Sequence, residues 1–543
     1  MIFQSLFIVF TFFYLLRTVR NIFYQLFLWQ LKEYRWDRMY IHLKTYQGKK
    51  LVFGKISLIK WFAIFLWPFF ESVGIYYFYY PYFPILIFFI YFTEGTLYLL
   101  EARSGFKMPK FTPKTLGVIT LTVLILIFSY FNFITFSPFG LTLLLLDKIL
   151  PLIIASFILI FSVPSLIYKK IIYMRAGLKR KSLPELKVIG ITGSFGKTST
   201  KEFLFTLLSS KYKVVKTNDF INTEIGVAKS LLSDVSSKTE FYIAEMAAYK
   251  KGEIKLISKI VAPDIGVVTA INEQHLELFG SIENTMKAKY ELIESLKNNG
   301  IAIFNGNNKY CLTMEKWAKE KGLTTIIYGT NPQTARDLIA YDIKTYPDKL
   351  TFKVKKGKEV EAFDVQVLGF HNIENLLAAI ALSTIENMKL REISMVAKKI
   401  RPFKKTMEPI EGINKSLFIN DTFNVNPESV SAAISYLQQF KRKKILILQP
   451  MIELGDKTDK LHEKVIEEAV RVCDYIFLTN LNYHVAIMNG ARKVEKGEKK
   501  VKSGTSEEIV MLLEGLLDPG DVVIFEGKET EKIMKRLLSK NKK

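Results

Sequence analysis

The chain has 543 residues, a formal net charge of +24 and only two cysteines. Its length predicts about three to four domains, and Cys311 and Cys473 stand too far apart, without a partner motif, to support a disulfide framework or a zinc site. Much of the positive charge flanks apolar segments or lies on predicted helices. Lipid headgroups and solvent explain that charge better than nucleic acid, so we expect no nucleic-acid partner.

The first third of the chain is dominated by Phe, Leu, Ile and Tyr. Five stretches approach the roughly 20 apolar residues that a membrane-spanning helix needs: residues 2–16, 58–80, 83–100, 116–136 and 141–168. Basic residues cluster in alternate connections, which would all lie on one membrane face. We therefore expect a helical transmembrane domain over residues 1–182, a multi-pass location in the cytoplasmic membrane, membrane lipid as a partner, and the remaining domains in the cytoplasm.

Residues 188–192 predict a short strand that runs into a glycine-rich turn ending in Gly196-Lys197-Thr198-Ser199. Backbone amides in such a turn can face phosphates, Lys197 can reach the β and γ oxygens, and the Thr198 hydroxyl can bind Mg²⁺. The turn is a variant, because Ile191 stands where the generic loop has glycine. We expect ATP and Mg²⁺ as cofactors, bound through Thr192, Gly193, Ser194, Gly196, Lys197, Thr198 and Ser199.

After this turn, short apolar runs alternate with helix-length segments. This alternation of strands and helices predicts an α/β domain with a mostly parallel, doubly wound sheet over residues 183–400. Alternating polar and apolar positions at 337–367 predict an antiparallel meander at its edge. A second strand-helix series predicts a smaller Rossmann-like domain over residues 401–543.

Further signatures follow in a fixed order: the Asn-rich stretch Thr217 to Gly226, Glu245 at the tip of a strand, the string Gly369 to Asn375, and the string Asp421 to Pro427. Together with the phosphate loop they resemble the Mur ligase family over about residues 187–540, most closely its branch that adds D-alanyl-D-alanine. The resemblance implies a P-loop ATPase domain, a C-terminal Rossmann-like domain, and an ATP-dependent amide ligase of cell-envelope synthesis that acts through an acyl phosphate. Its expected partners are an acidic or muramoyl-peptide acceptor and an amino-acid or dipeptide amine.

The resemblance also implies residue roles. The catalytic residues would be Lys197, Lys289 and His275, with Lys289 carbamylated, and the metal ligands would be Thr198, Glu245 and His275. ATP would further contact Asn305, His371, Asn372, Asn375 and Asp421, and the substrates Asn222, Thr223, Asn424 and Asn426. Plainer readings stay open from the residues alone: a capped helix for the Asn-rich stretch and for Asn372, a rim salt bridge for Glu245, a structural hydrogen bond for His275 and a surface position for Lys289.

The chain departs from the family's pattern in three places. Lys405-Thr406-Met407 and Gly527-Lys528-Glu529 replace an arginine-containing pair and a closing Gly-Ser-Arg. Apolar segments stand where the family has its uridine-binding domain, so two acid substrates stay open. The default that the resemblance implies is a uridine-linked muramoyl peptide, to which a D-alanyl dipeptide is added, and the other is a lipid-linked acid or one held by the N-terminal domain. A poly-γ-glutamate-type ligase is the alternative within the class. An ATP-driven transporter is the alternative outside it, suggested by Glu71, Glu94 and the pair Asp147-Lys148 within the apolar segments.

Overall fold

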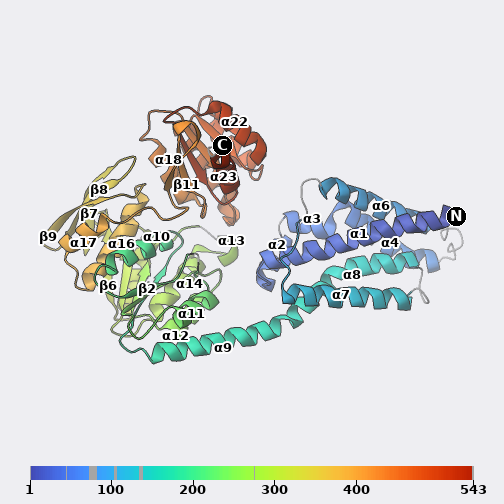
Figure 1. Cartoon of the computed structure of the whole chain (residues 1–543), viewed down its shortest axis with the longest axis horizontal. Helices are drawn as coiled ribbons and strands as arrows, with labels where there is room; N and C mark the ends of the chain where they lie inside the picture. Colours follow the sequence, from blue (N-terminus) through green and yellow to red (C-terminus); the bar gives the residue numbers. More distant parts are fainter. Residues whose placement is uncertain are drawn as a thin grey trace. The chain divides into compact units, whose positions relative to one another are not determined.

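The computed structural model describes residues 2–44, 46–72, 82–102, 107–133, 139–219, 221–273 and 276–540. The chain forms two compact units, Met1–Lys170 and Ile171–Lys543, and each is described by itself (Figure 1).

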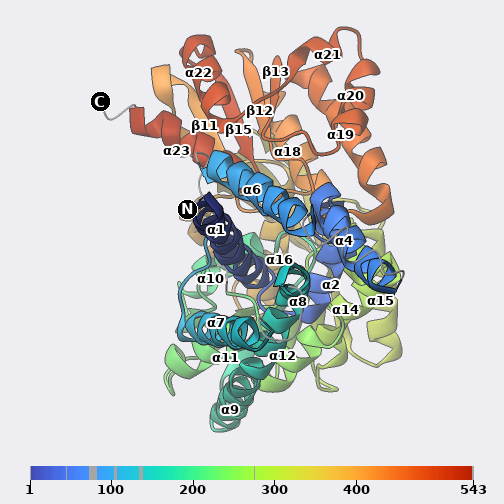
Figure 2. The ribbon, with the colours of Figure 1, turned by 90° about the vertical axis from the view of Figure 1, so that its right-hand side faces the viewer.

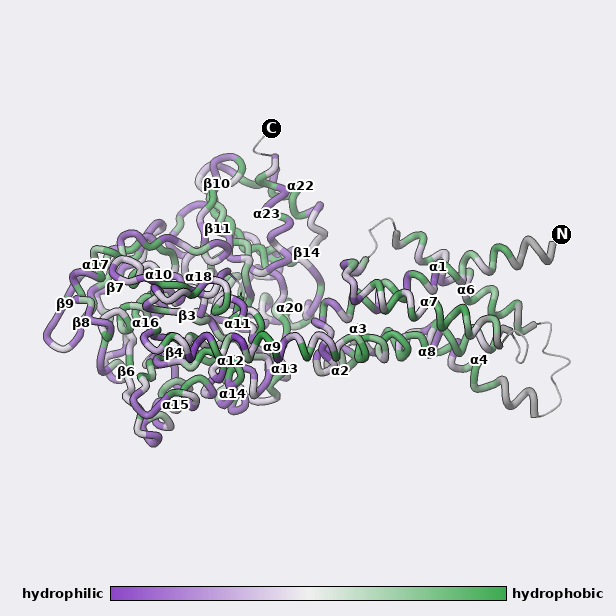
Figure 3. Tube along the Cα trace, turned by 60° about the horizontal axis from the view of Figure 1, so that its bottom comes forward, coloured by the Kyte–Doolittle hydropathy of each residue, from purple (hydrophilic) through white to green (hydrophobic). Residues whose placement is uncertain are grey.

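The described part of the first unit is helical. Its helices are α1 (Ile2–Leu31), α2 (Trp36–Lys44), α3 (Tyr46–Phe53), α4 (Lys55–Ser72), α6 (Tyr82–Ala102), α7 (Pro113–Phe133), α8 (Phe139–Ile160) and the start of α9 (Ser162–Lys181). Apolar residues recur along all of them (Figure 3). Leu26, Trp29 and Ile154 belong to one buried cluster, and Ile87 and Leu144 to another, so these helices bury part of their apolar surface against one another.

Four helices of this unit each contribute one buried charge to a shared network. Lys60 on α4 contacts Glu94 on α6 at 2.5 Å and Asp147 on α8 at 2.8 Å. Arg17 on α1 contacts Glu94 at 2.9 Å and also pairs with Asp147. Two cations therefore face two anions, and each charge has two opposite partners.

The prediction of a multi-pass location in the cytoplasmic membrane is wrong. Among the described residues, one helical stretch, Leu141–Lys181, is long and apolar enough to cross a membrane, and Ile85–Leu100 and Pro113–Ser129 are shorter. Parts of two predicted spans, at residues 73–80 and 134–136, lie outside the described residues. The physical reason for the error is that apolar composition does not distinguish a lipid-facing helix from one that packs against other helices.

The central sheet of the second unit has nine strands in the order β2-β3-β1-β4-β5-β6-β7-β8-β9. The parallel strands are β1 (Lys187–Thr192), β2 (Val214–Lys216), β3 (Phe241–Glu245), β4 (Ile265–Val268), β5 (Ile301–Asn305) and β6 (Thr324–Gly329). They continue into β7 (Leu338–Thr345), β8 (Leu350–Lys356) and β9 (Glu359–Val365), where β8 runs antiparallel to both neighbours. The predicted parallel sheet with an antiparallel edge is confirmed.

Helices cover both faces of this sheet because the side chains of each strand alternate between them. Ile189 and Ile191 of β1 pack with α10 (Lys197–Leu208), α16 (His371–Ile385) and α17 (Leu390–Ala397). Val188 packs on the other face, which is covered by α11 (Glu224–Ser233), α12 (Glu253–Val261), α14 (Ile282–Glu294), α15 (Lys309–Glu320) and the end of α9. The short helix α13 (Leu276–Phe279) precedes α14.

A second sheet has the order β10-β11-β15-β12-β13-β14. Its strands are β10 (Glu408–Glu411), β11 (Leu417–Asp421), β12 (Lys444–Leu448), β13 (Tyr475–Leu478), β14 (Val501–Ser503) and β15 (Val522–Glu526), and all but β10 run parallel. The helices around it are α18 (Pro427–Leu437), α19 (Thr458–Val472), α20 (His484–Arg492), α21 (Gly497–Lys500), α22 (Ser506–Leu516) and α23 (Thr530–Lys540). Figure 2 shows α18 and α19 on one side of this sheet and α22 and α23 on the other. The predicted Rossmann-like region is confirmed, and the domain boundaries at 182 and 400 stay a prediction.

Candidate functional site

The phosphate loop connects β1 to α10, and two of its glycines have conformations that exclude other residues. Gly193 has a φ of 150°, and a Cβ there would lie 2.1 Å from the Thr269 hydroxyl. Gly196 has a φ of 78°, and a Cβ there would lie 2.2 Å from the side-chain Oδ1 of Asn375. The loop therefore requires glycine at both positions. Ser194 N–H anchors it by donating to the Ala270 carbonyl at 2.7 Å.

The first turn of α10 is open at the loop, because its N-cap residue Gly196 supplies no side-chain cap. Backbone N–H groups at a helix start carry partial positive charge and bind anions. The Lys197 ammonium folds back over the same loop and donates to the carbonyls of Gly193 at 2.8 Å and Ser194 at 3.1 Å. Burial lowers the pKa of Lys197, while the nearby Glu245 opposes that shift. An anionic ligand would offset the free-energy cost of burying this ammonium.

Glu245 ends β3 and is fully buried. The Thr198 hydroxyl donates to its Oε2 at 3.0 Å, and the Asn222 amide donates to its Oε1 at 3.0 Å. The Glu245 side chain is thus inside the site, not in a salt bridge at the rim of the sheet. A carboxylate beside a hydroxyl offers the hard oxygen ligands that Mg²⁺ prefers, and Mg²⁺ keeps several waters as well. Thr198 and Glu245 therefore fit a magnesium ion.

Lys201 is a buried cation that the sequence analysis missed. Its Nζ lies 3.4 Å from Glu245 Oε2 and 3.5 Å from Glu202 Oε1, and it has no hydrogen-bond partner among the described residues. The sequence did carry a signal for it. Residues three and four apart share a helix face, so Lys201 had to lie beside Thr198 and Lys197.

Lys289 on α14 is buried and donates to the Ala248 carbonyl at 3.2 Å, so it is not a surface lysine. Burial, and secondarily the positive charge of Lys197, lowers the pKa of Lys289 to about 7. A sizeable fraction of this amine is therefore neutral at neutral pH and is a nucleophile.

The predicted ligand His275 lies outside the described residues, so its role stays a prediction. Within the described ranges, no three His, Cys, Asp or Glu side chains gather as a metal cluster.

The residues predicted on the adenosine side are joined by hydrogen bonds. The Asn305 amide donates to Glu374 at 2.6 Å. The Asn372 amide donates to the Leu368 carbonyl at 2.8 Å, and the Asn375 amide donates to the Asn372 side chain at 3.0 Å. Asn372 thus ties α16 to the preceding loop through its side chain.

Two residues of this group have features that bear on the nucleotide assignment. Asn375 also accepts from Thr200 at 3.4 Å and lies against Gly196, so it borders the phosphate loop. His371 has a buried Nδ1 without a hydrogen-bond partner among the described residues, and burial lowers its pKa to about 4. A neutral imidazole with a free ring nitrogen can hydrogen-bond a ligand.

The predicted residues of the C-terminal domain lie at and after the end of β11. Asp421 ends that strand and is buried, and Asn424 is exposed in the following loop. Asn426 is the N-cap of α18, where its side chain accepts from Ser429 N–H at 3.0 Å and Pro427 follows. Thr223 is likewise the N-cap residue of α11, without a side-chain cap bond. The Asn426 oxygen is therefore engaged by its helix.

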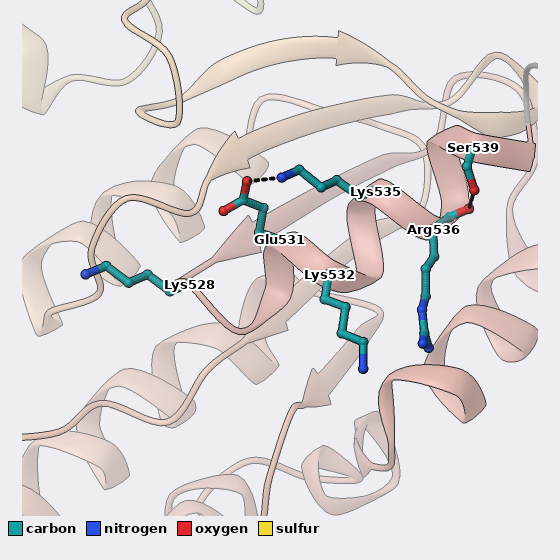
Figure 4. A pocket seen from close by; sticks show the side chains of 6 residues that line it. All are labelled: Lys528, Glu531, Lys532, Lys535, Arg536 and Ser539. Carbon is teal, nitrogen blue, oxygen red and sulfur yellow. Dashed lines mark hydrogen bonds and ion pairs between the residues drawn. The ribbon is translucent and has the colours of Figure 1, made fainter. Parts of the chain in front are cut away.

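A separate hollow of about 440 Å³ lies on α23. Figure 4 shows its lining residues, Lys528, Glu531, Lys532, Lys535, Arg536 and Ser539. Glu531 pairs with Lys535 at 2.7 Å, and Arg536 pairs with Glu507. The hollow contains none of the predicted site residues.

Comparison with known proteins identifies the family. Residues 191–383 match the Mur ligase middle domain, and residues 407–529 match the Mur ligase glutamate ligase domain. The chain is 30% identical to the UDP-N-acetylmuramoyl-tripeptide--D-alanyl-D-alanine ligase of Bacillus subtilis over 66% of this chain and 78% of that protein. The N-terminal helices up to α8 lie outside both matched domains.

Solved structures give the same result. MurF from Acinetobacter baumannii is 26% identical with a TM-score of 0.62, covering 68% of this chain and 80% of that one. MurF from Thermotoga maritima in complex with ADP is 25% identical with a TM-score of 0.60, covering 69% of this chain and 84% of that one. The family resemblance and the expectation of ATP and Mg²⁺ are confirmed. The chain therefore belongs to the Mur ligase family and is an ATP-dependent ligase that forms amide bonds.

Proposed function

We propose that this chain joins D-alanyl-D-alanine to a UDP-N-acetylmuramoyl tripeptide in peptidoglycan synthesis. The substrates are inferred from the curated relatives, of which the Bacillus subtilis ligase carries this activity in its name. The observation that carries the chemistry is the buried contact between Thr198 and Glu245 beside the phosphate loop.

A carboxylate does not react with an amine until it is activated. In the proposed reaction a carboxylate oxygen of the tripeptide attacks the γ-phosphorus of ATP, which releases ADP and leaves an acyl phosphate. The dipeptide amine then attacks the acyl carbon, inorganic phosphate leaves, and the amine proton passes to solvent. Both steps require that the reacting groups be held together and that charge on the transferred phosphoryl group be neutralised.

The described residues supply these requirements. Lys197 and the open N-terminus of α10 bind the phosphates. Thr198 and Glu245 would hold Mg²⁺, which would supply positive charge against the charge of the transferring phosphoryl group. Asn222 fixes one Glu245 oxygen, and Lys201 adds positive charge next to the other. Lys289 is another buried lysine of the site, and its carbamylation stays a prediction.

The remaining assignments are proposals of the same kind. His371 and Asn375 offer polar atoms near the loop for the nucleotide, with Asn305, Asn372 and Asp421 as additional contacts. Asn424 is exposed and free to meet a substrate, together with Asn222 and Thr223. Asn426 shapes the loop by capping α18.

The test is phosphate release by the purified full-length protein with magnesium-ATP, with and without each substrate, followed by mass spectrometry of the products. We expect release to require both substrates and the product to be heavier by one dipeptide. Phosphate release with glutamate and without the dipeptide would favour a poly-γ-glutamate-type ligase and overturn the proposal.

The variant Glu245→Ala tests the metal assignment in the same assay. We expect at least about a hundredfold loss, which is typical when a charged group at the transferring phosphoryl is removed, and a raised Mg²⁺ requirement. The exposed Glu185→Gln is the matched control. Full ligation by Glu245→Ala would show that Glu245 is not the ligand.

A further inference from the structure

Two buried carboxyl groups lie side by side at one edge of the C-terminal sheet. Strands β11 and β15 are parallel neighbours, and Asp421 and Glu526, the last residue of each, are register partners. Register partners on neighbouring strands point to the same face of the sheet. Asp421 is 8% exposed and Glu526 is fully buried. Neither carboxyl group can be solvated well.

The hydrogen bonds of Glu526 leave one oxygen for Asp421. Glu526 Oε1 accepts from the Ser429 hydroxyl at 2.5 Å, in the first turn of α18. Glu526 Oε2 is buried and receives no hydrogen bond from a donor group. The carboxyl group of its register partner Asp421 is the neighbour left for this oxygen. Carboxylates only accept, so the two groups can hydrogen-bond to one another only if one of them carries a proton.

The charged groups around the pair are engaged elsewhere. Lys405, in the loop before β10, pairs with Glu531 of α23 at 2.9 Å, and Glu408 of β10 accepts from Asn420 at 2.9 Å. On other elements the neighbours are Glu428 of α18 and Leu448 of β12, and Glu428 accepts a hydrogen bond from Asn272. Lys528 and Glu529 follow β15, and Glu529 accepts from Thr479. None of these described contacts places a cation on Asp421 or Glu526, so a proton is what neutralises the pair.

We propose that Asp421 and Glu526 share one proton at neutral pH, and that Glu526 is the residue that positions Asp421 for the nucleotide. This rests on the proposed contact between Asp421 and ATP. The Ser429 bond fixes Glu526, and the shared proton fixes Asp421 against Glu526. Asp421 Oδ1 accepts from the Met407 N–H at 3.4 Å and keeps a second lone pair for a ligand hydroxyl.

Electrostatics favour the shared proton. Burial raises the pKa of Asp421, and burial together with the negative charge of Asp421 raises the pKa of Glu526. A carboxyl group whose pKa is higher in the folded than in the unfolded chain stabilises the fold at low pH, and that contribution is lost as the pH rises through the folded-state pKa. Loss of the proton leaves two buried anions in contact, so Asp421 moves away from Glu526.

The experiment measures the dissociation constant of ADP by calorimetry from pH 6 to pH 9 with the full-length protein. We expect wild-type affinity to fall as the pH rises. Glu526→Gln should remove that fall, because its amide donates to an ionised Asp421 at every pH. Glu526→Ala should weaken binding about tenfold, the effect of losing one hydrogen bond to a charged group. The exposed Glu529→Gln is the matched control.

If Glu526→Gln keeps the wild-type pH dependence, the pair shares no proton and the proposal is overturned. Should Glu526→Ala fail to fold, Ser429→Ala replaces it. This variant removes the hydrogen bond to Glu526 without changing Asp421, and it should shift the pH at which ADP affinity falls. An unshifted midpoint of the ADP affinity profile would also overturn the proposal. Both measurements use ADP and no ligase substrate. A failed ligation assay with a flattened ADP profile would therefore overturn the proposed substrates alone.

Discussion

The two units of this protein handle buried charge in opposite ways. In the helical unit, Arg17 and Lys60 face Glu94 and Asp147, so the four charges of this network cancel. At the phosphate loop, by contrast, Lys197 and Lys289 donate to backbone carbonyls, and Lys201 lies 3.4 Å from Glu245 and 3.5 Å from Glu202.

The difference indicates what each set of charges does. A network that is already neutral holds helices together and offers nothing to a charged ligand. A cation that donates only to neutral backbone carbonyls can be stabilised by an anion from outside, and a polyphosphate with Mg²⁺ supplies such an anion. A cation without a hydrogen bond to a carboxylate, such as Lys197 or Lys289, is therefore the better indicator of a ligand site, whereas the mere presence of buried charge is not.

The largest expected effect is on the neutral network. Lys60→Met leaves Glu94 and Asp147 with one cation between them, and breaking a buried ion pair costs about 3–5 kcal/mol. Trp29, Trp36, Trp61 and Trp67 are four of the five tryptophans and all lie in this unit, so denaturant unfolding followed by tryptophan fluorescence reports it. ADP affinity should stay unchanged, and the exposed Lys55→Met on the same helix is the control. An unchanged free energy of unfolding in Lys60→Met would show that the charge network does not stabilise the helical unit.

The next effect is at the phosphate loop. Lys197→Ala should lower ATP turnover about 100- to 1000-fold, because one of the cations that neutralise the transferring phosphoryl group is lost. Steady-state phosphate release measures it, and the exposed Lys238→Ala should behave as wild type. Wild-type turnover in Lys197→Ala would contradict the view that the buried cations serve the nucleotide.

A smaller effect concerns Lys289, whose pKa of about 7 makes its charge depend on pH. Above pH 7 the neutral amine predominates and can add to CO₂, with loss of one proton, to give a carbamate. We expect ligase activity at pH 8 to fall about tenfold in CO₂-depleted buffer and to recover when bicarbonate is added. A tenfold change corresponds to about 1.4 kcal/mol in free energy. Lys289→Ala should not respond to bicarbonate, whereas the exposed Lys287→Ala should respond as wild type does. An equal response in Lys289→Ala would remove the carbamate from the mechanism.

The smallest effect separates a structural residue from a binding one. Asn426→Ala should cost about 1 kcal/mol in unfolding free energy, because α18 loses its N-cap, with little change in KM for either substrate. Asn424→Ala should change KM and leave stability as it was, since its side chain is exposed. The reverse pattern would mean that Asn426 binds substrate.

Much of the catalytic region follows from the sequence because its determinants are local. Gly193 and Gly196 mark a turn that only glycine fits, and the alternation of apolar runs with helical segments sets a parallel sheet whatever the details of packing. The order of the signatures from Thr192 to Asp421 then identifies the family. Nucleotide chemistry, the fold class and the family were therefore predictable before any coordinates.

Tertiary structure decided the rest, because it depends on which distant residues meet. Lys201 and Glu526 carry no motif, and they become relevant only where α10 packs beside β3 and where β15 pairs with β11. Glu94 and Asp147 suggested a transport pathway from sequence, yet they are neutralised by Arg17 and Lys60, which lie 77 and 87 residues away from them along the chain. Apolar composition could not show this, since the energy of a buried charge depends on its neighbours in space and not on its neighbours in sequence.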